Sequence, residues 1–150
     1  MSISLVLATD NDVELVMAWR NQEKVYAGFY TQKKPLEWGE HIRWWRSRNQ
    51  DWREFIIWLD TRRIGVVSIG QLDHWSPEIG YFIGETSLWH QGYGKEAVKL
   101  TLAWLKEYGK EYCHTTVLKH NSHSISLLIS LGFEVLGKAR EGELWLTKKL

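Results

Sequence analysis

Apolar residues along the chain follow the period of a strand in some segments and the period of a helix in others. Ile3–Ala8 is an aliphatic run typical of a buried strand, and Phe55–Leu59 and Ile64–Leu72 are two further strand segments. The three residues of Asp60–Arg62 are short enough for an antiparallel hairpin between the last two. Glu78–Ile83 is predicted as a fourth strand.

The helical segments have recognisable starts. Thr9 and Asp12 form a capping-box pattern, which predicts that a helix begins at Thr9. Asn21–Lys34 has weak periodicity and several turn formers, so it is predicted to be mostly loop. Pro35 suits the first position of a second helix. The apolar stripe of that helix would be Trp38, Ile42 and Trp45.

Lys95–Tyr108 has the clearest helical pattern, and Gly109 is placed to end it. The remaining residues predict a strand, a short helix and a closing hairpin, at His114–Lys119, Asn121–Gly132, and Phe133–Leu136 with Leu144–Thr147. The order of elements is that of a mixed α/β (α+β) layer fold. The length of 150 residues fits a single domain over positions 1–150.

Composition excludes several classes of protein. Nineteen Lys and Arg against 18 Asp and Glu give a net charge of +1, which argues against a nucleic-acid partner. Cys113 is the one cysteine, so no intrachain disulfide can form. No apolar run approaches the roughly 18 residues needed to span a bilayer, and the N-terminal residues lack a signal-peptide pattern. We therefore expect a cytoplasmic protein with no membrane association.

The most informative segment is the glycine-containing turn Trp89–Lys95, which lies between a predicted strand and a predicted helix. Glycines there leave backbone N–H groups unobstructed at the positive end of a helix, where they can bind a pyrophosphate. Lys95 would add a positive charge. The alternative is a tight turn that needs glycine only for its backbone conformation.

Two phosphate-binding motifs compete for this turn. A P-loop requires Ser or Thr after Gly-Lys, and Glu96 follows Lys95 here. A dinucleotide fingerprint fits locally, but it expects an acidic residue about 20 positions later. The chain has Lys119 and His120 in that region, so the dinucleotide interpretation is disfavoured.

The segment Trp-x-x-Gly-Tyr-Gly-x-Glu-Ala at residues 89–97 resembles the acetyl-CoA loop of the GNAT superfamily of N-acetyltransferases. Its leading Trp is similar to the branch that contains ribosomal-protein N-terminal acetyltransferases. Further segments resemble this family in order along the chain: Pro77–Tyr81, Asn121-x-x-Ser124, Leu131-Gly132-Phe133 and the closing hairpin. Trp19-Arg20-Asn21 and the helix around His41 resemble the front part of that branch and of its nucleotide-amino-sugar acetyltransferases.

The resemblance implies a GNAT-like mixed sheet of about seven strands and about four helices. In that fold the sheet splays open after the Glu78–Ile83 strand. The pantetheine arm of acetyl-CoA pairs with the free strand edge, and its pyrophosphate binds the amides of the glycine turn. By this analogy, the residues expected to bind acetyl-CoA are Phe82, Ile83, His90, Gln91, Gly92, Tyr93, Gly94, Lys95, Asn121 and Ser124. Asn121 and Ser124 could equally cap the helix that begins there.

Acetyl transfer from a thioester to an amine needs a proton acceptor for the amine and a proton donor for the leaving thiolate. Glu78 is the candidate base, although a strand-end carboxylate can be purely solvated. Many relatives carry a Tyr donor seven residues after the Asn, and this position is Leu128. Ser124, Tyr108 or a water molecule are the candidate replacements.

The acceptor groove of the family lies between the early helices and the last hairpin. The residues expected to bind the acceptor are Trp19, Arg20, Asn21, Trp38, His41 and Trp75. Trp45 and Trp145 are further candidates to line the groove, since the chain has 10 Trp and one small core cannot bury all of them. Exposed aromatic side chains would also suit a homodimer.

The sequence therefore predicts an N-acetyltransferase that moves an acetyl group from acetyl-CoA to a primary amine by direct attack. The acceptor would be a peptide N-terminus or an amino-sugar nucleotide. The alternative is a non-catalytic module on the same fold that binds acyl-CoA or a partner, which the absent Tyr at Leu128 keeps open. No metal is expected, because His120 and His123 lack a Cys or carboxylate set at ligand spacing.

Overall fold

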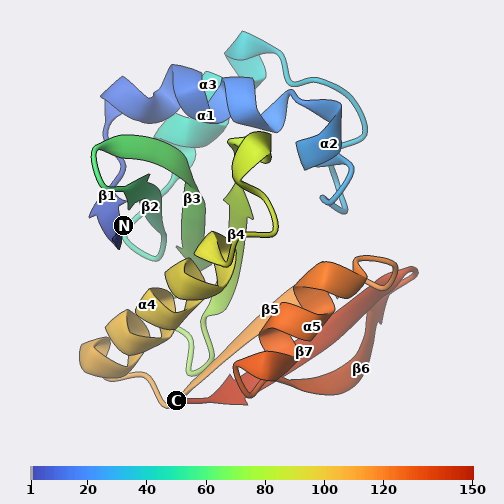
Figure 1. Cartoon of the computed structure of the whole chain (residues 1–150). Coiled ribbons are helices and arrows are strands. Elements are labelled where there is room, and N and C mark those ends of the chain that lie inside the picture. Colours follow the sequence, from blue (N-terminus) through green and yellow to red (C-terminus); the bar gives the residue numbers. More distant parts are fainter. Residues whose placement is uncertain (1) are drawn as a thin grey trace.

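The computed structural model of the chain describes residues 2–150, which form one seven-stranded sheet with helices on both faces (Figure 1). The spatial order of the strands is β1-β2-β3-β4-β5-β7-β6. All neighbours are antiparallel except β4 and β5, which run parallel. The strands are β1 Ile3–Leu7, β2 Arg53–Leu59, β3 Arg62–Gly70, β4 Glu78–Ile83, β5 Tyr112–Leu118, β6 Glu134–Arg140 and β7 Glu143–Lys149.

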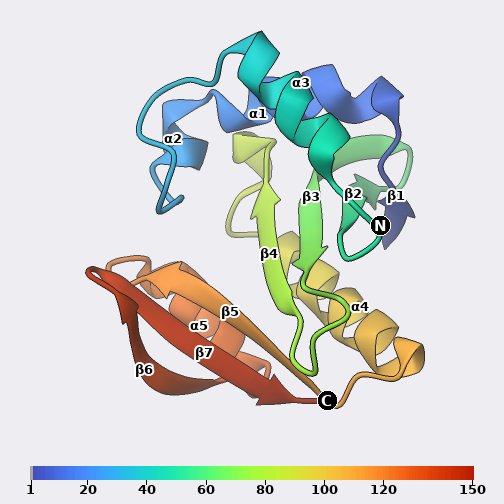
Figure 2. The same cartoon turned by 180° about the vertical axis from the view of Figure 1, so that it is seen from behind.

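Five α-helices cover the sheet. They are α1 Val13–Arg20, α2 Glu23–Tyr26, α3 Trp38–Ser47, α4 Tyr93–Tyr108 and α5 Ser122–Ser130, with short 3-10 turns at Asp10–Asp12 and Thr86–Leu88. Side chains of α1 and α3 pack with Ile56 and Val66 on one face of the sheet. Side chains of α4 and α5 pack with Ile57 and Val67 on the other face, and Figure 2 shows the arrangement from behind. The mixed, seven-stranded fold confirms the sequence prediction, with α2 as the additional helix.

Two predicted elements differ in detail. β1 was expected to be buried, yet it is an edge strand that pairs only with β2, and Val6 and Leu7 are 49% and 55% exposed. Pro35 does not begin a helix; α3 begins at Trp38, three residues later. The reason is a tertiary clamp. The Asn21 amide accepts the Leu36 N–H at 2.6 Å and donates to the Leu36 carbonyl at 3.3 Å, which fixes the backbone before α3.

Local capping signals are confirmed. The Thr9 hydroxyl and the Asp12 carboxylate form the reciprocal capping box, with the Thr9 N–H donating to Asp12 at 2.9 Å. The box opens a 3-10 turn that leads into α1. Gly109 ends α4 with a left-handed φ of 108°, a conformation that glycine adopts without steric cost.

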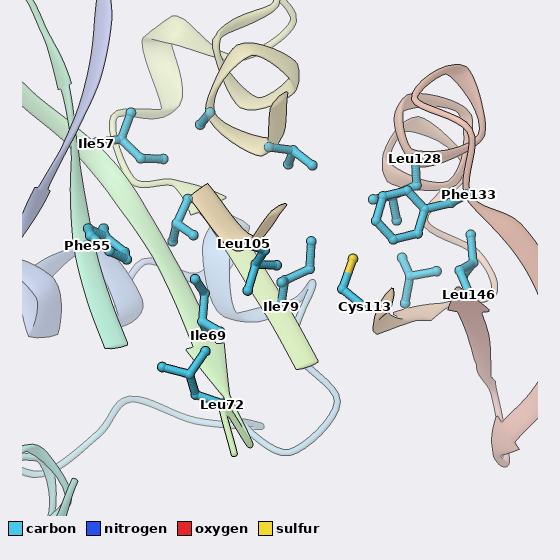
Figure 3. Close-up of a cluster of buried hydrophobic side chains, with 14 of the residues drawn as sticks. Phe55, Ile57, Ile69, Leu72, Ile79, Leu105, Cys113, Leu128, Phe133 and Leu146 are labelled. Carbon is cyan, nitrogen blue, oxygen red and sulfur yellow. The ribbon is translucent and has the colours of Figure 1, made fainter. Parts of the chain in front are cut away.

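The hydrophobic core continues from the β2–β4 half of the sheet to the β5–β7 half (Figure 3). Ile79 and Leu105 lie on one side of Cys113, and Leu128 and Leu146 lie on the other. Burial raises the pKa of the Cys113 thiol to about 12, so this side chain is an inert apolar group at neutral pH. Packing of this continuous core fixes how the two halves of the sheet are placed.

The two halves separate between β4 and β5. The strands share a single residue pair, Glu78 with His114, where the His114 N–H donates to the Pro77 carbonyl at 2.9 Å. The Thr115 hydroxyl donates to the Ile79 carbonyl at 2.7 Å. Beyond that point the edge of β4 that faces β5 has no strand partner, and Figure 1 shows the strands diverging. The predicted splay is therefore present.

Within residues 2–150, no helix has the length and apolar character needed to cross a membrane.

A close approach of Gly84 to Trp19 gives a stability prediction. A Cβ at position 84 would overlap the Trp19 ring. That ring is buried and held by its indole hydrogen bond to Glu85 at 2.6 Å, so it cannot move aside cheaply. We expect Gly84→Ala to lower the free energy of unfolding in urea by about 2 kcal/mol or more.

The matched control is Gly39→Ala in α3, where the nearest atom to a new Cβ is the end of the Arg43 side chain at 3.5 Å. Higher helix propensity should make this variant more stable than the wild-type chain by about 0.5–1 kcal/mol. Equal stability of Gly84→Ala and the wild-type chain would contradict the close packing of Trp19.

Candidate active site

A cleft of about 1070 Å³ opens where β4 and β5 diverge. The unpaired edge of β4 runs along the cleft between its two ends, which different parts of the chain form. One end is formed by the glycine turn, the start of α4 and the start of α5. The other end is formed by α1, the segment after α2, and side chains of α3 and β2. A smaller hollow of about 590 Å³ shares Glu78, Thr116, Arg140 and Glu143 with the cleft.

The glycine turn presents free backbone donors to the cleft. Gly92 has a left-handed φ of 88°, and the first intrahelical bond runs from the Glu96 N–H to the Gly92 carbonyl at 3.1 Å. The amides of Tyr93, Gly94 and Lys95 precede that bond and have no acceptor within the helix. They lie at the positive end of a 16-residue helix, so the turn can bind an anion.

Neighbouring side chains hold this turn in place. The Trp89 indole donates to the Ile83 carbonyl at 2.8 Å, which ties the turn to the end of β4. The His90 and His123 rings pack edge-on with their centres 4.5 Å apart, and this contact ties the turn to α5. His90 lines the cleft, whereas Gln91 lies outside the lining and donates through its side chain to the Ser87 carbonyl at 3.3 Å.

Hydroxyl groups meet at the start of α5. The Asn121 side chain caps the helix by accepting the Ser124 N–H at 3.2 Å. The Ser124 hydroxyl is thereby free of the capping role, and it lies 2.6 Å from the Tyr81 hydroxyl of β4. Burial raises the pKa of Tyr81, with the Ser124 hydrogen bond acting in the opposite direction. Sequence reasoning missed Tyr81, because its contact with Ser124 joins residues 43 positions apart.

Glu78 is the first residue of β4 and the one that pairs with β5, and its side chain is 51% exposed. Its carboxylate is 3.5 Å from His114 Nε2, and His114 Nδ1 is 3.2 Å from the Ser76 hydroxyl. Glu78 lines both the cleft and the smaller hollow. The arrangement can accept a proton from a group in the cleft. Sequence reasoning found Glu78 and missed His114, because their contact depends on strands 36 residues apart.

The far end of the cleft contains a buried charge cluster. Glu54 accepts the Trp52 indole N–H at 2.8 Å and lies 3.4 Å from the Arg48 guanidinium. Burial raises the pKa of Glu54, opposed by these contacts and by the charge of Arg20. Sequence reasoning missed Glu54, because the strand was predicted to begin at Phe55, whereas β2 begins at Arg53.

Arg20 lies beside this cluster and among aromatic rings. Its guanidinium carbon is 5.5 Å from the ring centre of Phe29 and 5.3 Å from that of Trp44. The Nε of Arg20 is buried and makes no hydrogen bond within residues 2–150. Burial lowers the pKa of this guanidinium, with Glu54 opposing the effect. This end of the cleft therefore offers a cation and aromatic surfaces to a ligand.

Most of the residues expected at the acceptor groove lie elsewhere. Of the six, Arg20 alone lines the cleft. Trp19 and His41 are each 2% exposed, and His41 Nε2 is 3.1 Å from the Val13 carbonyl. Asn21 clamps Leu36, while Trp38 and Trp75 are exposed outside the lining. Of the two further candidates, Trp45 is buried in the core and Trp145 lines the smaller hollow.

The raised pKa of Glu54 predicts a pH effect on stability. A carboxyl whose pKa is higher in the folded state binds its proton more tightly there. Stability is then lost as the pH rises from the ordinary value of 4.5 through the folded value. We expect the free energy of unfolding of the wild-type chain, relative to Glu54→Gln, to fall over this range. Urea titrations at a series of pH values measure the difference, and a constant difference would contradict the prediction.

Comparison with known proteins agrees with this geometry. Residues 3–134 match the model of the Acetyltransferase (GNAT) domain family. An uncharacterized protein of Methanocaldococcus jannaschii is 46% identical over 138 residues, which is 90% of this chain. The chain spans 28% of the length of that relative.

Solved structures share the fold over nearly the whole chain. A domain from Methanocaldococcus jannaschii superposes with a TM-score of 0.94 at 42% identity, covering 99% of each chain. Spermidine N-acetyltransferase from Vibrio cholerae, in complex with CoA and spermine, superposes with a TM-score of 0.86 at 14% identity. The match covers 98% of this chain and 95% of that one. Aminoglycoside acetyltransferase AAC(6')-Ib, in complex with coenzyme A, superposes with a TM-score of 0.86 at 15% identity. The match covers 99% of this chain and 95% of that one. From the family match and this shared fold, we conclude that the chain belongs to the GNAT acetyltransferase domain family.

Proposed function

We propose that the protein is an acetyl-CoA-dependent N-acetyltransferase that acts on a primary amine. The observation that carries the proposal is the splay: β4 and β5 share one residue pair, and the open edge of β4 runs toward a helix N-terminus with free amides. An unpaired strand edge binds an amide-rich chain by adding it as a strand. An adjacent helix N-terminus binds a phosphate. Pantetheine and pyrophosphate occur in that order in acetyl-CoA.

The residues present fit such a ligand. The backbone of Tyr81 and the N–H of Ile83 face the open edge and would pair with the pantetheine arm. The predicted Phe82 backbone faces β3 instead, and the Ile83 carbonyl already accepts the Trp89 indole N–H. The amides of Tyr93, Gly94 and Lys95 would hold the pyrophosphate. Asn121 supports the same path, since its Oδ1 caps α5 and its side-chain NH₂ group points across the cleft toward Gly28. The bound thioester supplies an activated acetyl group.

Glu78 is the proposed base. An attacking amine must lose a proton, and a carboxylate at the closed end of the splay can accept it directly or through water. His114 supports the carboxylate from β5, and Ser76 in turn contacts the His114 ring. Because Glu78 lines both hollows, the proton can leave toward the smaller one, away from the acceptor.

The acceptor end favours an amino-sugar nucleotide over a peptide N-terminus. Arg20 can pair with a phosphate, and the rings of Phe29, Trp44 and Trp52 can stack with a flat base. Two structural neighbours are an aminoglycoside acetyltransferase and a spermidine N-acetyltransferase, which supports an amine as the acceptor class. A non-catalytic acyl-CoA module remains the second candidate, favoured by the buried, hydroxyl-free Leu128.

Calorimetric titration tests the acetyl-CoA site. We expect the wild-type chain to bind acetyl-CoA and not NAD. A Cβ at Gly94 would lie within 4 Å of Tyr81, Leu127 and Ile83, so the indole of Gly94→Trp would fill the cleft at the turn. This variant should bind at least about tenfold more weakly, a loss of about 1.4 kcal/mol.

Gly94→Ala is the matched control, because its methyl group meets those neighbours at ordinary contact distances of 3.7–3.9 Å. It should bind acetyl-CoA nearly as well as the wild-type chain. If the folded wild-type chain binds no acetyl-CoA, the proposed function is wrong.

Turnover with an amino-sugar nucleotide, with a peptide amine as the comparison, tests the base. Glu78→Gln keeps the shape of the side chain and removes the proton acceptor. We expect kcat to fall by about a hundredfold or more with the Kd for acetyl-CoA unchanged. Glu134→Gln on the exposed part of β6 is the control and should keep full activity. Unchanged turnover of Glu78→Gln would remove Glu78 from the mechanism.

A further inference from the structure

Thioester acyl transfer releases a thiolate, which leaves more readily when a proton is supplied to the sulfur. Leu128, on the inner face of α5, is 1% exposed and has no proton to give. The other ionisable groups that line this end of the cleft are His90, Tyr93, Lys95, His120 and His123. They come from the turn and from α5 or the residues just before it, and none lies on β4, whose open edge is proposed to carry the thioester.

We propose that the Tyr81 hydroxyl is the proton donor to the leaving sulfur and that Ser124 is its positioning residue. This inference rests on the proposed function. Tyr81 lies on β4, and its hydroxyl is 2.6 Å from the Ser124 hydroxyl at the start of α5. Both residues line the cleft. The hydroxyl pair therefore bridges the two elements between which the pantetheine arm would lie.

Packing fixes the Tyr81 ring at this place. Tyr81 shares its strand face with Ile79 and Ile83, and all three pack against the core on the α4 side. A Cβ at Gly94 would lie 3.7 Å from Cε2 of Tyr81, so the ring contacts the first turn of α4. Its hydroxyl then extends to the first turn of α5. The ring thus spans the space between the glycine turn and the Asn121 cap.

Ser124 is free to hold this hydroxyl because Asn121 performs the capping. Side chains on a helix lean toward its N-terminus, so a donor at position 128 would extend over the turn that contains Ser124. Tyr81 brings a hydroxyl to the same turn from the opposite wall. A donor supplied by β4 accounts for an apolar residue at position 128.

The proton transfer balances as follows. As the carbon–sulfur bond breaks, its electron pair goes to sulfur, and sulfur takes the Tyr81 proton. The phenolate takes the Ser124 proton, and Ser124 takes one from water. Glu78 holds the proton lost by the amine and gives it to the hydroxide left by that water, so all three side chains return to their starting states. Burial raises the pKa of Tyr81, so the hydroxyl is protonated at neutral pH before each turnover.

The test compares Tyr81→Phe with Tyr108→Phe. The structure excludes Tyr108, which the sequence offered as a candidate donor, because it lies at the opposite end of the 16-residue α4, half exposed and outside the cleft lining. We expect Tyr81→Phe to lower kcat by about ten- to a hundredfold, below the upper range for general acids because a thiolate is a good leaving group. Tyr108→Phe should retain the wild-type kcat. Ser124→Ala should lower kcat less than Tyr81→Phe does. Thermal melting curves should show that both variants are folded.

A second measurement does not depend on turnover. The ultraviolet absorbance of the thiolate gives the pKa of the CoA thiol in the complex with CoA. A hydroxyl that donates to the sulfur stabilises the thiolate, so Tyr81→Phe should raise this pKa by about one unit. A ring with only a packing role would leave it unchanged. The Kd for acetyl-CoA should stay close to that of the wild-type chain.

The outcomes separate the two proposals. If the wild-type chain binds and turns over acetyl-CoA and Tyr81→Phe keeps both kcat and the thiol pKa, the role of Tyr81 is wrong. A weaker Kd with unchanged kcat and thiol pKa would also overturn it, leaving Tyr81 as a binding residue. If the wild-type chain neither binds nor uses acetyl-CoA, the proposed function itself fails.

Discussion

The structure depends on one backbone pairing, that of Glu78 with His114, as the sole residue pair between β4 and β5. Parallel strands of this length could pair along their whole edge, and here they separate after one position. The core holds them apart, because apolar side chains fill the space on the α4 and α5 side from Leu105 through Cys113 to Leu128. The cleft is therefore a product of packing, and its width is set before any ligand arrives.

Much of the proposed chemistry lies on the six residues of β4. Strand alternation directs Ile79, Tyr81 and Ile83 to the core on the α4 side. Phe82 points to the other face, where it contacts Phe29 and Trp19 edge-on. One short strand thereby contacts both the proposed acetyl-CoA path and the acceptor end. Its side chains project to the two faces of the sheet, so none of them covers the backbone edge, which stays open to a ligand.

Local signals in the sequence were sufficient for the β4 strand, the glycine turn and the caps at Thr9, Gly109 and Asn121. Each depends on neighbours within a few residues, and each is present in the structure. The acceptor end could not be found in this way. Composition showed an excess of tryptophan without showing which rings are buried. The start of α3 was also predicted wrongly, because the contact of Asn21 with Leu36 that fixes it joins residues 15 positions apart.

The two ends of the cleft come from different stretches of the chain. Arg20, Phe29, Trp44 and Glu54 belong to the first 54 residues, and the β4 edge, the turn and α5 belong to residues 78–130. The loop after α2 touches the second stretch where the Phe29 ring meets the Phe82 ring edge-on. Substitutions in that loop can therefore change which amine is accepted while the acetyl-CoA path keeps its shape. The fold allows acceptor preference to diverge among relatives without rebuilding the donor site.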